Sequence, residues 1–457
     1  MRSVDAAIEI VIVQNPIVLE LFGIRGSTAG EIATSVEAAI RDGRLVPGAQ
    51  LPTIRALAGE LGVSPMTAAS AYRELRRRGL VLAAGRLGTR VAPRPPLPVR
   101  APISIPAGVR DLASGNPDPE LLPSLADALA GIDAAPRLYV EEGKLPVLVE
   151  HATGQFAADG IAVPALAVVG GALDGVERVL QAHLRPGDRV AVEDPGFVRA
   201  YDLLRPLGLY LDAVGVDEQG MRPEELEAAL GRGARAVILT PRAQNPTGAA
   251  LDERRAGELR ALLDERPGVL VVEDDHAAGV AGSPAFTVCS HERPNWATVR
   301  SVSKSLGPDL RLAVLAGDAT TIARVEGRQL LGTGWVSGLL QQVVAAHWSD
   351  PATRKRLERA EDTYTARRQA LLEALAAHGI AAYGRSGLNV WVPVAEEAPV
   401  VATLLQHGWA VTATERWRLA SPPAIRITSA TLEPAESARL AADLGDALAT
   451  RAGTYSA

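Results

Sequence analysis

Residues 301–313 read SVSKSLGPDLRLA, and this stretch places one lysine, Lys304, among small hydroxyl residues immediately after an apolar run. An ammonium group in such a loop is either a solvated surface charge or the amine that holds a cofactor through a covalent bond. The stretch alone does not separate these two interpretations. The rest of the chain decides between them, because a lysine-bound cofactor needs several further partners.

Five apolar runs between residues 166 and 303 predict a buried sheet. The runs are continuous rather than alternating, as expected for parallel strands that are covered on both faces. Helical patterns such as GVERVLQAHL and ERRAGELRALLDE lie between them. This order predicts an α/β fold whose ligand binds at the carboxyl ends of the strands. The predicted strands are LAVVGG (166–171), RVAVED (189–194), AVILTP (236–241), VLVVEDD (269–275) and TVRSVS (298–303).

The residues that follow these strands suit the parts of pyridoxal 5'-phosphate. Lys304 would form the imine (Schiff base), Asp274 would pair with the ring nitrogen, and Asn245 would donate to the ring hydroxyl. Phe197 would stack on the ring, although packing in the core explains a phenylalanine equally well. The candidate phosphate ligands lie at a helix start and after the last strand, namely Gly171, Ala172, Leu173, Ser301, Ser303 and Arg311.

The motifs NPTG, EDD and SVSK, with an arginine seven residues after the lysine, resemble the fold-type-I aminotransferases over residues 111–450. The resemblance implies a domain that binds pyridoxal phosphate in a homodimer, with Tyr139 reaching the neighbouring subunit's phosphate. It also implies that Arg426 grips the carboxylate of a substrate or effector, with Arg199 as a second candidate. A surface salt bridge and a packed tyrosine are the alternative interpretations of Arg426 and Tyr139.

The amino-terminal region differs in charge from the rest of the chain. Residues 26–100 contain eleven arginines and five acidic residues, a net charge of +6, so the chain's net charge of −6 leaves −12 for the remainder. A basic segment on an acidic body predicts a module that meets phosphates. A solvated basic face is the alternative.

Residues 26–92 predict a winged helix-turn-helix. Gly62 separates two short helical patterns, and Ser64 and Pro65 suit the N-cap and first position of the second helix. Two short strands joined by GRLG (85–88) follow as a hairpin. The second helix of such a motif lies in the major groove of double-stranded DNA. The residues that we expect to read or position DNA are Thr53, Arg55, Ser64, Met66, Thr67, Arg73, Arg86 and Gly88.

The stretch LPTIRALAGELGVSPMTAASAYRELRRRG, followed by GRLGTRV, resembles the GntR family of DNA-binding regulators. One departure concerns how the DNA is read. Pro65 stands where that family often has arginine, so indirect readout of DNA shape is an alternative to direct base contacts.

A proline-rich segment, residues 93–110, joins the two predicted domains as a semi-rigid linker. A GntR-like head joined in this way to an aminotransferase-like body is similar to the MocR family of transcriptional regulators. The stretches SGNPDPELLP and GWVSGLLQ look closest to its PtsJ-like branch, which is associated with vitamin B6 metabolism. The resemblance implies an effector-sensing body and a head-to-tail homodimer.

Three functions follow from this resemblance. The first is a transcriptional regulator whose small-molecule effector is pyridoxal 5'-phosphate itself. The second is a regulator whose effector is an amino compound that reacts with bound cofactor, and the third is a true aminotransferase with a DNA-binding appendage. Phe197 and His276, both cofactor-site candidates, stand where many relatives have tyrosine. The loss of two phenols should impair catalysis more than binding, so we expect at most weak aminotransferase-like activity.

Composition argues against several other classes of protein. A chain of 457 residues that is 47% hydrophobic can bury a large core. The single cysteine, Cys289, excludes an intramolecular disulfide, and no clustered Cys/His spacing suggests a metal site. No apolar run reaches the roughly 18 residues of a membrane span, and MRSVDAAIEI lacks a signal-peptide layout. We expect a cytoplasmic protein that has no metal and does not enter the membrane.

Overall fold

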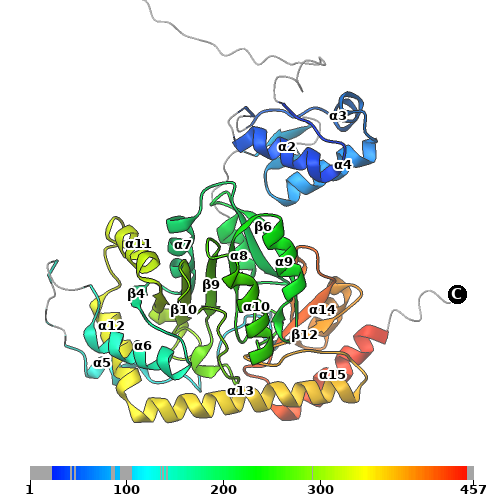
Figure 1. Cartoon of the computed structure of the whole chain (residues 1–457). Coiled ribbons are helices and arrows are strands. Elements are labelled where there is room, and N and C mark those ends of the chain that lie inside the picture. The colour runs from blue at the N-terminus through cyan, green and yellow to red at the C-terminus, as the bar shows by residue number, and fades with distance from the viewer. Residues whose placement is uncertain are drawn as a thin grey trace, which may run out of the picture. The chain divides into compact units, whose positions relative to one another are not determined.

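The chain divides into two compact units, here termed the head and the body, with the boundary between Pro102 and Ile103 (Figure 1). The predicted wing tip, with Arg86, and most of the proline-rich linker lie outside the residues that the structure describes. The computed structural model describes residues 23–41, 44–45, 48–83, 88–92, 105–133, 135, 138–139, 143–290 and 292–449.

The head is a winged helix-turn-helix, as its sequence predicts. Gly62 ends the first helix of the motif in the left-handed region, with φ of 65°. Ser64 then caps the second helix, and Pro65 occupies its first position. A short antiparallel hairpin forms the wing. The elements are α2 (Ala29–Arg41), α3 (Ile54–Leu61), α4 (Pro65–Arg77), β1 (Val81–Ala83) and β2 (Thr89–Val91).

An eight-stranded sheet in the order β4-β11-β10-β9-β8-β5-β6-β7 forms the centre of the body. β10, β9, β8, β5 and β6 are parallel to one another, whereas β11 is antiparallel to both β10 and β4, and β7 is antiparallel to β6. The five predicted runs are β4, β5, β8, β9 and β10, whereas β6 and β11 were not predicted. The strands are β4 (Ala165–Val169), β5 (Arg189–Asp194), β6 (Tyr210–Asp217), β7 (Gly220–Met221), β8 (Ala234–Leu239), β9 (Leu270–Asp275), β10 (Trp296–Ser301) and β11 (Ala313–Gly317).

Helices cover both faces of this sheet, so successive residues of a strand pack into two different hydrophobic cores, one on each face. Val169 packs with α7, α8 and α11, whereas its neighbour Val168 packs with α6, α9, α10 and α12. Both faces are therefore apolar, which explains the continuous runs in the sequence. The helices are α5 (Leu125–Ala130), α6 (Pro146–Ala158), α7 (Ala172–His183), α8 (Val198–Leu204), α9 (Pro223–Gly231), α10 (Glu253–Asp264), α11 (Ala319–Leu330) and α12 (Gly338–Ser349).

A smaller lobe completes the body. The 27-residue helix α13 leads into this lobe and contributes Leu371 and Leu375 to its core (Figure 1). Its three-stranded sheet has the order β12-β15-β14, and β13 pairs in parallel with β3. The elements are β3 (Arg110–Asp111), α13 (Pro351–Ala377), β12 (Asn389–Pro393), α14 (Glu397–Gln406), β13 (Trp409–Ala410), β14 (Thr412–Ala413), β15 (Ala424–Thr428) and α15 (Pro434–Ala449), with short 3₁₀ helices η2 (Ala278–Val280), η3 (Pro308–Leu310) and η4 (Glu415–Trp417).

Among the described helices, none combines the length and the apolar character that crossing a membrane requires.

The head should unfold independently of the body. Leu75 of α4 is fully buried in the head's own core, so Leu75→Ala should lower the head's free energy of unfolding by about 2–5 kcal/mol. Hydrogen exchange would show faster opening of head amides and unchanged protection in the body. Leu82→Ala is the matched control, because Leu82 is exposed. Equal loss of protection in both units would contradict a separate head.

Candidate functional site

Lys304 lies in the loop between β10 and η3, where its side chain is partly buried. Its Nζ donates a hydrogen bond of 2.5 Å to the carbonyl oxygen of Gly115. Burial, with the nearby positive charges of Arg426 and Arg199 adding to it, lowers the pKa of Lys304 to about 8. A larger share of this amine is therefore neutral near pH 7 than in an exposed lysine, and a neutral amine is the nucleophilic form.

Asp274 is the second-to-last residue of β9, and its side chain is partly exposed although its Oδ1 is buried. Burial, with the neighbouring charge of Asp275 adding to it, raises the pKa of the Asp274 carboxyl to about 7. Its Oδ1 has no hydrogen-bond partner among the described residues. A buried carboxylate oxygen without a partner is costly, so this position suits a cationic or N–H-bearing ligand group.

Two of the predicted phosphate ligands, Gly171 and Arg311, lie beside each other at the start of α7. Gly171 caps this helix with φ of 107°, and a Cβ there would lie 3.1 Å from Nη2 of Arg311. A side chain at Gly171 would therefore fill the space beside the guanidinium. Ala172 and Leu173 form the first turn, where free N–H groups favour an anion. Ser301 ends β10, which is separated from β4 by β11 in the sheet. Its hydroxyl donates a hydrogen bond of 3.1 Å to that of Ser303.

Asn245 and Arg426 join the two lobes of the body. Nη1 of Arg426 donates to Oδ1 of Asn245 at 3.1 Å, and Asn389 donates to the same oxygen at 3.3 Å. The amide oxygen is thereby occupied, which leaves the Asn245 amide N–H groups to act as the donors that the sequence predicted.

Two aromatic rings cover this region. Phe197 and Trp417 lie with ring centroids 6.0 Å apart, and the guanidinium of Arg426 lies 4.6 Å from the centre of the Trp417 ring. Sequence reasoning found Phe197 and missed Trp417, because no motif surrounds that tryptophan. The carboxylate of Asp194 accepts the backbone N–H groups of residues 419, 420 and 421, and so fixes the loop that follows Trp417.

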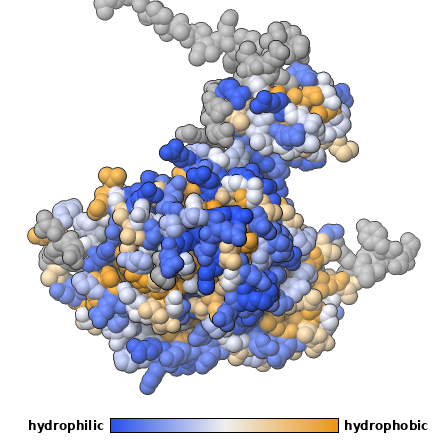
Figure 2. Space-filling model, viewed as in Figure 1, coloured by the Kyte–Doolittle hydropathy of each residue, from blue (hydrophilic) through white to orange (hydrophobic). Residues whose placement is uncertain are grey.

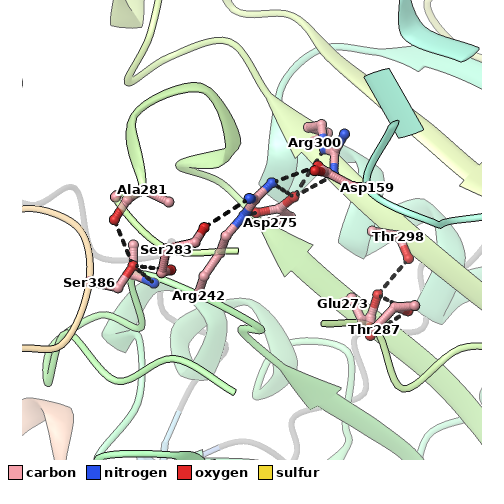
Figure 3. A network of polar contacts seen from close by, with 12 residues as sticks. Asp159, Arg242, Glu273, Asp275, Ala281, Ser283, Thr287, Thr298, Arg300 and Ser386 are labelled. Atoms are coloured by element: carbon pink, nitrogen blue, oxygen red, sulfur yellow. Dashed lines mark hydrogen bonds and ion pairs between the residues drawn. The ribbon is translucent and has the colours of Figure 1, made fainter. Parts of the chain in front are cut away.

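A buried ion-pair network surrounds Asp275, the residue after Asp274 (Figure 3). Asp275 accepts two hydrogen bonds from Arg242, at 2.8 and 3.0 Å, and one of 3.0 Å from Arg300. Both arginines also bond to Asp159. Successive strand residues face opposite sides, so Asp275 holds the end of β9 while Asp274 faces away from the network. Arg242 lies three residues before Asn245, and the network therefore also fixes the loop that presents this amide.

The remaining site candidates have different surroundings. His276 lies two residues after Asp274. Burial, with the charge of Lys304 adding to it, lowers the pKa of His276 to about 4, so its imidazole is neutral near pH 7. Arg199 is the second residue of α8. Tyr139 is 91% exposed, and its ring meets Trp335 edge-on at 5.8 Å rather than the Lys304 site of its own chain.

In the head, the two helix starts carry most of the predicted DNA-binding residues. Thr53 caps α3 by accepting from the backbone of Ala56, and Ser64 caps α4 by accepting from that of Thr67. The hydroxyls of Ser64 and Thr67 are 2.8 Å apart, so they bond to each other as well. The other described candidates are Arg55 and Met66, both exposed, Arg73, which bonds to Ser70, and Gly88, at the start of the second wing strand.

Comparison with known proteins agrees with both units. Residues 108–444 match the family of class I and II aminotransferases, and residues 28–91 match the gntR family of bacterial regulatory proteins. Among solved structures, an archaeal alanine:glyoxylate aminotransferase has a TM-score of 0.69 at 19% identity, over 75% of this chain and 91% of its own. LysN, an α-aminoadipate aminotransferase from Thermus thermophilus, has a TM-score of 0.67 at 24% identity, over 75% and 93%. These likenesses establish the fold-type-I architecture of the body.

Curated transcriptional regulators are similar to this chain over most of its length. The vitamin B6 salvage pathway transcriptional repressor PtsJ of Salmonella typhimurium is 42% identical over 93% of this chain and 99% of its own length. The pyridoxine biosynthesis transcriptional regulator PdxR of Corynebacterium glutamicum is 26% identical over 76% and 78%. The protein is thus a regulator of the helix-turn-helix class with an aminotransferase-like body. It belongs to the MocR type of the GntR regulators.

Loss of the Asp275 charge should destabilise the body. Burial alone would raise the pKa of this carboxyl, but Arg242 and Arg300 lower it below its ordinary value of 3.8. The ionised group therefore stabilises the fold above that pH, and the contribution is lost as the pH falls below it. Asp275→Asn should lower the free energy of unfolding by about 3–5 kcal/mol at pH 7, because two buried arginines, Arg242 and Arg300, would each lose a carboxylate partner.

Chemical denaturation of the body at several pH values measures this effect. The difference between wild type and Asp275→Asn should shrink as the pH falls below 4. Asp362→Asn on the exposed side of α13 is the matched control and should change stability by less than about 0.5 kcal/mol. An Asp275→Asn protein as stable as that control at pH 7 would rule out a structural role for the network.

Proposed function

We propose that this protein is a transcriptional regulator that senses pyridoxal 5'-phosphate and controls a gene of vitamin B6 metabolism in the cytoplasm. The observation that carries the proposal is that the body holds both Lys304, an amine with a pKa of about 8, and Asp274, whose buried Oδ1 has no hydrogen-bond partner among the described residues. The relatives PtsJ and PdxR, both named for vitamin B6 pathways, support the choice of ligand and of target gene.

The described residues fit each part of this ligand. Oδ1 of Asp274 would accept a hydrogen bond from the protonated pyridine nitrogen, and the amide of Asn245 would donate one to the ring oxygen. The space beside Gly171 and Arg311 would take the phosphate, because a helix start and a guanidinium both favour an anion. Ala172, Leu173, Ser301 and Ser303 would complete the clamp, and Phe197 would lie against the ring.

The ligand supplies an aldehyde, which condenses with a primary amine. Lys304 would supply that amine, and burial, with the charges of Arg426 and Arg199 adding to it, makes a larger share of it neutral near pH 7 than in an exposed lysine. His276 is neutral and Phe197 has no hydroxyl, so neither provides the phenol that many relatives have there. These residues favour holding a ligand over the repeated proton transfers that transamination requires.

We further propose that the protein acts as a head-to-tail homodimer on double-stranded DNA. A set of large apolar side chains is exposed around Trp335, more than an isolated chain of this kind should leave open. Figure 2 shows hydrophobic surface on the side of the body where α5 and α11 lie. A second copy is the occupant that fits, since it would also bring Tyr139 to a neighbouring site. The exposed residues are Leu138, Tyr139, Leu330, Leu331, Trp335 and Leu339.

A short backbone segment offers a route from the site to the DNA-binding head. Gly115 accepts the hydrogen bond of Lys304, and it lies five residues after the end of the predicted linker. Condensation removes both hydrogens of the neutral amine, so this hydrogen bond would be lost when the ligand binds. Ligand binding can then change DNA affinity, provided that the two arrangements of the heads differ in affinity for the ligand.

Lys304→Ala should abolish the sensing of pyridoxal phosphate. In the wild type, adding the ligand should change the affinity for DNA from the protein's own promoter by at least about tenfold, or about 1.4 kcal/mol of coupling. Borohydride reduction and mass spectrometry should find a pyridoxyl group on Lys304. Lys355→Ala, at an exposed position of α13, should behave as wild type. If DNA binding by Lys304→Ala still depended on pyridoxal phosphate, the proposal would be wrong.

The rate of attachment should depend on pH through Lys304. Because the neutral amine reacts and its pKa is about 8, the rate should rise through pH 8 and level off above it. Arg426→Gln should move this midpoint to higher pH, since it removes a positive charge near the amine. Visible absorbance of the bound ligand measures the rate. A rate that still climbs at pH 10 would mean that Lys304 titrates like an exposed lysine.

A further inference from the structure

We infer that the ligand site does not recognise a carboxylate, and that the protein therefore responds to the phosphorylated aldehyde rather than to an amino acid. This inference rests on the proposed function. It concerns Arg426, in the middle of β15, for which the resemblance to the aminotransferases implied a carboxylate receptor. It also concerns the backbone segment Ala113–Gly115 after β3, here termed the strap.

A guanidinium grips a carboxylate through two parallel N–H bonds. In one geometry the two donors are Nη1 and Nη2. In the other geometry they are Nε and the terminal nitrogen on the same side, which is Nη2. Both geometries therefore require a free hydrogen on Nη2 of Arg426.

Both hydrogens of Arg426 Nη2 are already used in hydrogen bonds within the protein. This nitrogen donates to the carbonyl oxygen of Ala113 in the strap and, at 3.1 Å, to the hydroxyl of Thr412 on β14. A terminal guanidinium nitrogen carries two hydrogens, and these two bonds use both. The Thr412 hydroxyl in turn donates to the same Ala113 carbonyl at 3.0 Å, so the three groups form a closed set.

Other parts of the Arg426 guanidinium are also in contact with the protein, although its Nε has no hydrogen-bond partner among the described residues. Nη1 donates to Asn245, and the ring of Trp417 lies 4.6 Å from the guanidinium carbon. A Cβ on Gly115 would lie 3.5 Å from both Nη1 and Nη2, so the strap backbone borders the outer edge of the guanidinium. A carboxylate could accept a single hydrogen bond from the second hydrogen of Nη1 or from Nε, but not a bidentate pair, because these two hydrogens point to different sides of the guanidinium.

The strap thus takes the place that a carboxylate would need. Its Ala113 and Gly115 carbonyl oxygens accept hydrogen bonds from Arg426 and Lys304. Arg426 is a positioning residue in this arrangement, because it holds the strap and Asn245. An aldehyde reaches Lys304 without disturbing Arg426, whereas a carboxylate must break the closed set first.

The test compares L-norvaline with butylamine, which is the same compound without its carboxylate. Each is added to the full-length protein loaded with pyridoxal phosphate, at equal concentrations of unprotonated amine. Borohydride reduction and mass spectrometry then give the fraction of Lys304 that still carries a pyridoxyl group. We expect the two compounds to displace Lys304 within about tenfold of each other, less than one bidentate charged pair would give.

Thr412→Val provides the sharper test, because it frees one hydrogen of Nη2 without touching the arginine. It should raise the preference for norvaline over butylamine by about tenfold. Thr412→Ser keeps the hydroxyl and should match wild type, and Arg426→Gln should leave the wild-type ratio unchanged. If Arg426→Gln fails to fold, the Thr412 pair decides alone.

Two results would overturn the inference, and they are distinguishable. A wild-type preference for norvaline far above tenfold, lost in Arg426→Gln, would show that Arg426 binds carboxylates while the proposed function stands. The absence of any pyridoxyl group on Lys304 before amines are added would overturn the proposed function, and the inference with it.

Discussion

The carboxyl of Asp274, whose Oδ1 is buried, is the feature on which the rest of the candidate site depends. It lies at the end of a central strand, and its Oδ1 has no hydrogen-bond partner among the described residues. A polar atom left in this state costs about 1–3 kcal/mol. The fold tolerates this cost because Arg242, Arg300 and Asp159 hold the adjacent Asp275 firmly on the opposite face (Figure 3). The structure therefore preserves an acceptor that gains its partner when a ligand arrives.

Much of this arrangement is predictable from the sequence, because it follows from local rules. Continuous apolar runs predict five of the central strands, and the residues at the end of each run predict which side chains lie near the ligand. Ser64 and Pro65 locate the start of the recognition helix through capping alone. Motifs of this kind work because the carboxyl ends of parallel strands meet at one edge of a sheet.

The rest depends on contacts between residues that lie far apart in the chain. Trp417 belongs to no motif, and it is brought to Phe197 by a loop that Asp194 holds through three backbone N–H groups. Arg300 and Asp159 are more than a hundred residues apart, yet they share an ion pair. The antiparallel strand β11 was missed because its short apolar run gives no sign of direction. The state of Arg426 also escaped prediction, since a sequence does not reveal which acceptors already occupy a guanidinium.

The central claim is that ligand binding at Lys304 and DNA binding by the head affect each other's affinity. Binding linkage requires that coupling be reciprocal, so DNA must change the affinity for pyridoxal phosphate by the same factor by which pyridoxal phosphate changes the affinity for DNA. The most direct measurement is a titration of the full-length protein with pyridoxal phosphate, in the presence and absence of saturating promoter DNA. The account predicts two dissociation constants that differ by that factor. Identical dissociation constants would contradict it, because the ligand would then be a fixed cofactor and not a signal.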